Sequence, residues 1–251
     1  MRPLTFAMPL LALLGALPAR AEMPVPPMTD AERSAFQAEV HDYLIAHPEV
    51  LMEMMSLLDA RQKAAAAETD KALVAQNSKG LFDDGYSWVA GNPDGAVTIV
   101  EFLDYQCAFC HKSYPDLQKL LAANGDIRLI VKDFPILGPG SELAARAATA
   151  AMIQGGPEAY GKLNAALMTA KGPVNDASLD AAIARAGLDS AAIRAGMADA
   201  EVGRRLAANR ALAEVLQVSG TPTFVVQDQM VRGYLDLAEM QKLVDSTHAT
   251  N

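Results

Sequence analysis

Two cysteines, Cys107 and Cys110, are the residues of this 251-residue sequence whose type and spacing most directly indicate chemistry. The apolar run 97–103 before them predicts a buried strand, and residues with helical spacing follow them. A cysteine at a helix start faces unpaired N–H groups and the positive end of the helix dipole, which favour a thiolate. Cys110 lies one turn deeper on the same face. An acidic outer sulfur beside a protected inner one is what thiol–disulfide exchange requires.

Three other interpretations of the cysteine pair remain open. An inert structural disulfide would close a loop of only four residues, which adds little stability. The sequence CAFCH, ending in His111, also matches the attachment signature of c-type haem. A zinc site would need a second Cys/His pair at ligand spacing, and the four scattered histidines supply none. The strand directly before the cysteines favours the redox interpretation, with no metal and no cofactor other than the Cys107–Cys110 dithiol, and with His111 on the helix surface.

Glu101 is a third candidate for the chemistry, because its carboxyl interrupts the apolar strand six residues before Cys107. Burial would raise the pKa of this carboxyl and let it exchange a proton with Cys110. The alternative is a partly solvated carboxylate at a sheet edge, since buried unpaired acids are rare. Lys132, on the next expected strand, is a candidate to neutralise it.

The first 21 residues have the pattern of a secretory signal peptide. Arg2 precedes a short apolar run over 4–17, and Ala19-Arg20-Ala21 supplies a small-residue cleavage site, with cleavage expected after Ala21. The apolar run is too short for a membrane span, although an uncleaved anchor stays open. Export places the cysteines in an oxidising compartment, here the periplasm of a Gram-negative bacterium. A formal net charge of −9 without a basic stripe argues against nucleic acid as a partner.

Residues 22–79 are expected to form a proline-rich linker followed by a helical arm. A helix over 29–46 and a second one over 48–79 are predicted, the first opened by a Thr29/Glu32 capping box. Both carry an apolar stripe that must be covered either by the chain's own domain or by copies of itself. The arm is therefore a candidate surface for a homo-oligomer, for example a trimer.

Residues 80–251 have the pattern of one α/β domain. Strands over 97–103 and 127–134, joined by the cysteine helix, predict a parallel βαβ unit, and residues 85–88 a possible edge strand. The stretch 141–218 contains only helical patterns. A hairpin over 223–234 and a last helix over 236–246 follow.

Three segments in this order, EFLDYQCAFCHKSYP, VKDFPILGPGSELAARAA and VSGTPTFVV, resemble the DsbA-like branch of the thioredoxin-fold proteins over about residues 80–248. The arm ending in DYLIAHPEVL is similar to exported proteins of the ScsC/Com1 type. The resemblance implies an α/β thioredoxin fold with an inserted helical subdomain at 141–218, plus the N-terminal helical arm.

The resemblance also implies the roles of individual residues. Cys107 attacks and forms the mixed disulfide, and Cys110 resolves it. A cis peptide bond at Thr221–Pro222 would lie beside the cysteines and offer the Thr221 backbone to a substrate peptide. Thr221, Pro222 and Phe109 are the expected substrate-binding residues. The implied partners are cysteine-containing exported proteins and a redox partner protein in the membrane.

The preferred function is an exported thiol–disulfide oxidoreductase that works as an isomerase or reductase, because Thr221 before the proline resembles isomerase-like members. The first alternative is a monomeric dithiol oxidase that donates its disulfide to folding proteins, and a haem electron carrier is a remote one. The dipeptide Ala108-Phe109 departs from better-known members, since it has neither proline nor imidazole, so the sequence predicts no strongly oxidising potential.

Overall fold

The computed structural model describes residues 28–248. The predicted signal peptide, 1–21, lies outside the described residues. The chain divides into two compact units, one ending at Leu58 and the other beginning at Asp59. Each unit is described by itself.

The described part of the first unit is helical. Helix α1 (Asp30–Ala46) begins at a capping box, in which the Glu32 amide donates to the Thr29 hydroxyl and the Glu32 carboxylate accepts from the Thr29 amide. Helix α2 (Glu49–Gln76) starts here and continues into the second unit. No residue of α1 is buried. The apolar stripe is solvent-exposed in the single chain and consists of Phe36, Val40, Tyr43, Leu44, Ile45, Leu51, Met52, Met54, Met55, Leu57 and Leu58.

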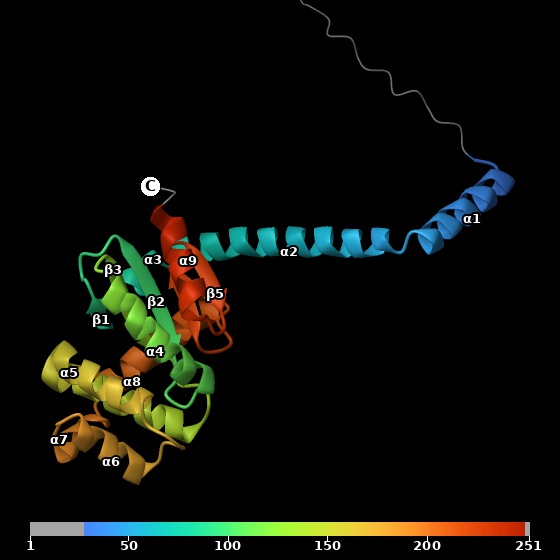
Figure 1. Ribbon diagram of the computed structural model, residues 1–251. Coiled ribbons are helices and arrows are strands. Elements are labelled where there is room, and N and C mark those ends of the chain that lie inside the picture. Colours follow the sequence, from blue (N-terminus) through green and yellow to red (C-terminus); the bar gives the residue numbers. More distant parts are fainter. Residues whose placement is uncertain (1–27, 249–251) are drawn as a thin grey trace, which may run out of the picture. The chain divides into compact units, whose positions relative to one another are not determined.

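The second unit is built on a five-stranded sheet with the order β1-β3-β2-β4-β5. Strands β2 (Val97–Leu103) and β3 (Ile127–Asp133) are parallel and are connected by α4 (Ala108–Ala123), which confirms the predicted βαβ unit (Figure 1). The other neighbouring pairs are antiparallel. The remaining strands are β1 (Trp88–Gly91), β4 (Thr223–Val226) and β5 (Gln229–Arg232).

The edge strand starts later than predicted. Gly85 has a φ of 76°, and the Asp84 carboxylate accepts hydrogen bonds from the amides of Tyr86 and Ser87. This side chain therefore holds the backbone in a turn where the sequence predicted a strand, so that β1 covers Trp88–Gly91 instead of 85–88. The predicted second helix also ends earlier, at Gln76, and a short helix α3 (Ser78–Phe82) follows.

Four helices form the predicted insertion. They are α5 (Pro139–Met168), α6 (Asp176–Arg185), α7 (Ser190–Gly196) and α8 (Ala200–Val215), and Figure 1 shows them grouped together and apart from α9 (Leu237–His248). Gly156, with a φ of 69° and a ψ of −163°, breaks α5 before Pro157. None of the helices within residues 28–248 combines the length and apolar character needed to cross a membrane.

Strand β2 has a hydrophobic cluster on each face, as its almost continuous apolar sequence predicts. Val97, Ile99 and Leu103 belong to the cluster that includes residues of α4, α5 and α9. Val100 and Phe102 belong to the opposite cluster, with residues of α2, α3 and α8. Since side chains alternate along a strand, Glu101 points to the same face as its neighbours 99 and 103, toward the cysteine helix.

Candidate active site

The turn between β2 and α4 places Cys107 at the N-cap of the helix, with φ −76° and ψ 115°. The buried Asp104 carboxylate holds this turn. It accepts hydrogen bonds from the amides of Gln106 (2.8 Å), Ile136 (2.8 Å) and Leu137 (3.0 Å). Asp104 was not among the predicted site residues, although an acid directly after a buried strand and before the cysteines was a usable signal.

The Cys107 side chain is held beside the loop that precedes β4. Its sulfur lies 3.0 Å from the Thr221 carbonyl oxygen, to which it donates when protonated, and the residue is 6% exposed. The pKa of the Cys107 thiol is lowered to about 5, chiefly by a hydrogen bond from Cys110. The amides of Phe109 and Cys110 lower it further. At neutral pH Cys107 is therefore a thiolate, the form that attacks disulfides.

Cys110 has the opposite character. It is fully buried, and its pKa is raised, first by the hydrogen bond to Cys107, then by burial and by the nearby Glu101 charge. Both cysteines are free in this structure. The lowered pKa of Cys107 favours its thiolate, and the raised pKa of Cys110 favours its thiol.

Glu101 is buried, with 3% exposure, so the solvated-edge alternative is wrong. Burial raises the pKa of its carboxyl to about 8, and the Cys107 charge adds to the shift. A pKa close to neutral allows the carboxyl both to donate and to accept a proton near pH 7.

Lys132 does not neutralise Glu101, which corrects the sequence prediction. Glu101 pairs with Val131 in the β2–β3 register, so Lys132 sits one position further along and points to the opposite face. There the fully buried Lys132 ammonium binds the Asp84 carboxylate (2.5 Å) and the Gly80 carbonyl (2.7 Å). The unpaired carboxyl of Glu101 is the reason that burial raises its pKa so strongly.

The sequence predicted that His111 lies on the helix surface, and this is wrong. The residue is half-buried, and each of its ring nitrogens lies within hydrogen-bond distance of a backbone carbonyl oxygen. Nε2 lies 2.7 Å from the Tyr105 carbonyl oxygen and Nδ1 lies 2.9 Å from that of Met168. In this arrangement neither nitrogen is available to an iron, so the geometry of CAFCH gives no support to the haem alternative. Within residues 28–248 no three His, Cys, Asp or Glu side chains are grouped to hold a metal ion.

The surroundings of Cys107 include the loop that carries Thr221 and an exposed aromatic ring. Thr221–Pro222 has a cis peptide bond, as the resemblance implied. Phe109 is 58% exposed, and its ring centroid lies 6.4 Å from that of Tyr234, over which the Lys112 ammonium sits at 4.1 Å. The structure thus brings Phe109 to the rim of the site, where it can contact a substrate, and adds Tyr234, which the sequence analysis did not single out.

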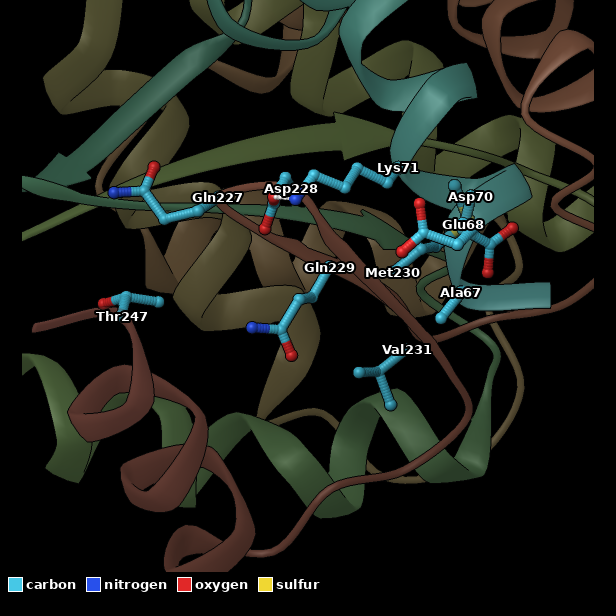
Figure 2. Close-up of a pocket in the computed structure, with 10 residues that line it drawn as sticks. All are labelled: Ala67, Glu68, Asp70, Lys71, Gln227, Asp228, Gln229, Met230, Val231 and Thr247. Atoms are coloured by element: carbon cyan, nitrogen blue, oxygen red, sulfur yellow. Dashed lines mark ion pairs between the residues drawn. The ribbon is translucent and has the colours of Figure 1, made fainter. Parts of the chain in front are cut away.

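A groove of about 660 Å³ lies elsewhere in the second unit, between the end of α2, the β4–β5 hairpin and α9. Figure 2 shows its lining, with an ion pair between Lys71 and Asp228. None of the predicted site residues lines this groove.

Comparison with known proteins agrees with this geometry. A family model described as thioredoxin matches residues 83–246. The chain belongs to the thioredoxin family. A second model, described as the N-terminal domain of the copper resistance protein ScsC, matches residues 32–65. The predicted α/β fold with a helical insertion and N-terminal helices is thereby confirmed, and so is the resemblance to DsbA-like and ScsC-type thioredoxin-fold proteins.

Solved structures of the thioredoxin family are similar to this chain over most of their length. A thioredoxin-like oxidoreductase from Silicibacter pomeroyi is 39% identical, with 68% of this chain and 97% of that one covered and a TM-score of 0.64. The thiol-disulfide exchange protein α-DsbA2 from Wolbachia pipientis is 29% identical, with coverages of 73% and 98% and a TM-score of 0.68. ScsC from Proteus mirabilis is 25% identical, with coverages of 89% and 100% and a TM-score of 0.67.

Longer relatives contain a similar segment. The Na(+)/H(+) antiporter NhaA 1 from Salinispora arenicola is 31% identical over 163 residues, which cover 64% of this chain and 24% of the antiporter. The chain therefore spans about a quarter of the length of the curated relatives it matches.

Proposed function

We propose that this protein is an exported, periplasmic thiol–disulfide oxidoreductase that exchanges disulfides with cysteine-containing proteins, acting as an isomerase or reductase. The observation that carries the proposal is the pair of sulfurs with opposite character. Cys107 has its pKa lowered to about 5 and lies 3.0 Å from the Thr221 carbonyl oxygen, while Cys110 keeps its proton beneath it. The comparisons support thiol–disulfide exchange as the class of reaction.

In the reductive direction the Cys107 thiolate attacks a client disulfide. A bond forms between Cys107 and one client sulfur, and the other client sulfur leaves as a thiolate and takes up a proton. Cys110 then attacks the Cys107 sulfur, which releases the second client thiol. The client disulfide gains two electrons and the protein's dithiol loses two.

Glu101 is the group that exchanges a proton with Cys110. Once Cys107 is in the mixed disulfide its negative charge is gone, and this removes one cause of the raised pKa of Glu101. The ionised carboxylate then accepts the Cys110 proton as that thiol attacks. In the oxidative direction the same carboxyl, whose pKa burial still raises, protonates Cys110 as it leaves.

A client peptide would bind in an extended conformation next to Thr221 and Pro222, because backbone groups at such an edge pair with a peptide strand. The exposed Phe109 ring and the half-buried Tyr234 ring supply aromatic surface beside it. Backbone pairing and aromatic contacts do not select a particular client sequence, which suits a protein that acts on many clients with incorrect disulfides. A membrane-bound redox partner would return the dithiol to its working state.

The N-terminal arm is proposed to assemble copies of the chain into a homo-oligomer, for example a trimer. The exposed stripe on α1 and the start of α2 contains eleven large apolar side chains. A stripe of this size in water is unfavourable unless another surface covers it. Several dithiols around one space suit isomerisation, in which a client thiol displaces Cys107 and no electrons are transferred in total.

Refolding of scrambled ribonuclease tests the proposal. The reduced protein should restore ribonuclease activity, and the Cys107→Ser variant should not. The alternative, a monomeric oxidase, predicts instead that the oxidised protein accelerates disulfide formation in reduced ribonuclease while scrambled ribonuclease stays inactive. That second outcome would reject the isomerase proposal and keep the exchange chemistry.

A further inference from the structure

The side chain of Gln106, the residue before Cys107, makes a contact that the reaction described above does not use. Gln106 is half-buried, and its Oε1 accepts a hydrogen bond of 2.8 Å from the Val174 amide, in the loop between α5 and α6. A backbone N–H group only donates, so the roles of the two groups in this bond are fixed. One side chain thus joins the turn that carries the reactive sulfur to the helical insertion.

The start of α5 reaches the same side chain. Gly140 lies in the first turn of this helix, and a Cβ at this position would lie 2.6 Å from Gln106 Nε2 and 2.5 Å from the Val174 carbonyl oxygen. Real Cβ atoms do not make contacts this short, so a glycine is required for the helix to come this close. Two separate parts of the insertion therefore pack against the amide group of Gln106.

The backbone of Gln106 is held by Asp104. The Asp104 carboxylate accepts from the Gln106 amide (2.8 Å), and the Asp104 carbonyl accepts from the Cys107 amide (3.0 Å). These bonds place Cys107 at the N-cap of α4, where the amides of Phe109 and Cys110 lower the pKa of its thiol. Hydrogen bonds weaken steeply when their geometry is lost, so this effect depends on the exact place of the sulfur.

We propose that Gln106 is a positioning residue through which the helical insertion sets the place of the Cys107 sulfur at the start of α4. The insertion holds its side chain and Asp104 holds its backbone, so a displacement on the insertion side moves the residue directly before the reactive cysteine. The value of this contact for disulfide exchange rests on the proposed function, whereas the coupling of the insertion to the sulfur does not.

Amide hydrogen exchange in the reduced, full-length protein, followed by NMR, tests the contact itself. Gln106→Met keeps the length of the side chain and removes the acceptor. We expect the Val174 amide to exchange about tenfold faster in this variant, as for the loss of one net hydrogen bond. Gln241→Met removes a side chain of α9 that bonds to Asp245, and it should leave the Val174 rate unchanged. The same Val174 rate in Gln106→Met and in the unaltered protein would overturn the proposal.

Absorbance at 240 nm tests the effect on Cys107 without a client protein. We expect the midpoint of thiolate formation to rise by about half a pH unit or more in Gln106→Met, about a threefold change in the ionisation constant, because the sulfur loses part of its alignment with the amides of the helix start. Gly140→Ala should act in the same direction from the insertion side, since its added Cβ displaces the Gln106 amide group. Gly203→Ala is the matched control in α8, where an added Cβ meets no atom within 4 Å, and its midpoint should equal that of the unaltered protein.

An unchanged midpoint in folded Gln106→Met would overturn the proposal even if Gly140→Ala shifts it, because the insertion would then act on Cys107 by another route. An unchanged midpoint in folded Gly140→Ala, or an equal shift in Gly203→Ala, would overturn it as well. If Gly140→Ala does not fold, Gln106→Met decides. A protein that shows these shifts and exchanges no disulfides with clients would reject the proposed function and keep the coupling.

Discussion

Replacing Glu101 by Gln should change how the stability of the protein depends on pH. Burial raises the pKa of this carboxyl from 4.5 to about 8 in the folded protein. Between these two values the folded protein holds a proton that the unfolded chain has already released. The contribution of Glu101 to stability is therefore most favourable at low pH and falls as the pH rises toward 8, because the carboxyl must take up a proton from solution when the chain folds.

The magnitude follows from the size of the shift. Each unit of difference in pKa corresponds to about 1.4 kcal/mol, so Glu101 lowers the free energy of unfolding by roughly 3 kcal/mol between pH 4 and pH 7 and by roughly 4–5 kcal/mol up to pH 9. The residue is only 3% exposed, so solvent screening reduces this little. Gln has nearly the same shape and does not ionise. We expect the difference between Glu101→Gln and the unaltered protein to grow by about 3 kcal/mol in favour of the variant from pH 4 to pH 7.

Guanidinium unfolding of both proteins at pH 4.5, 7 and 8.5 measures this difference, and other titrating groups cancel because both proteins contain them. The reduced protein should show the larger effect, because the Cys107 charge that contributes to the shift is absent in the disulfide form. A difference in unfolding free energy that stays constant from pH 4.5 to 8.5 would refute the reasoning, because Glu101 would then have an ordinary pKa.

Three further predictions concern other parts of the molecule. Burial raises the pKa of Asp133 to about 6. Asp133→Asn should therefore remove a stability loss of about 2.4 kcal/mol between pH 4 and pH 7, and urea unfolding with an unchanged pH slope would contradict this. Cys110→Ser should accumulate a mixed disulfide between Cys107 and a client peptide, detected by mass spectrometry, and its rapid disappearance would exclude Cys110 as the resolving sulfur. Replacing Phe36 and Tyr43 by Asp should reduce the particle mass in light scattering while the rate of peptide disulfide reduction per chain stays the same, and an unchanged mass would end the oligomer proposal.

Much of the fold was predictable because its signals are local. The apolar run of β2, the helical spacing after the cysteines and the absence of strand patterns over 141–218 gave the βαβ unit and the helical insertion. The edge strand was misplaced because the Asp84 side chain holds a turn that propensity does not reveal. The cis bond at Thr221–Pro222 came from the resemblance, since few X–Pro bonds are cis and the residues themselves do not show which.

The site was predictable as far as it depends on residue type and less so where it depends on register. Cys107, Cys110 and Glu101 were found from their spacing and from the apolar strand around them. Lys132 was assigned to the wrong face because the β2–β3 register, which pairs Glu101 with Val131, cannot be read from either strand alone. The contacts of the His111 ring were missed because one of its two carbonyl partners is 57 residues away in the sequence.

The ionisation of Cys107 is the measurement that tests the whole account most directly. Absorbance at 240 nm of the reduced protein, followed from pH 3 to pH 10 and compared with Cys107→Ser, records thiolate formation at this sulfur. The structure predicts a midpoint at about pH 5, with Cys110 remaining protonated throughout this range. A midpoint near pH 8.5, the value of an ordinary cysteine, would contradict the account.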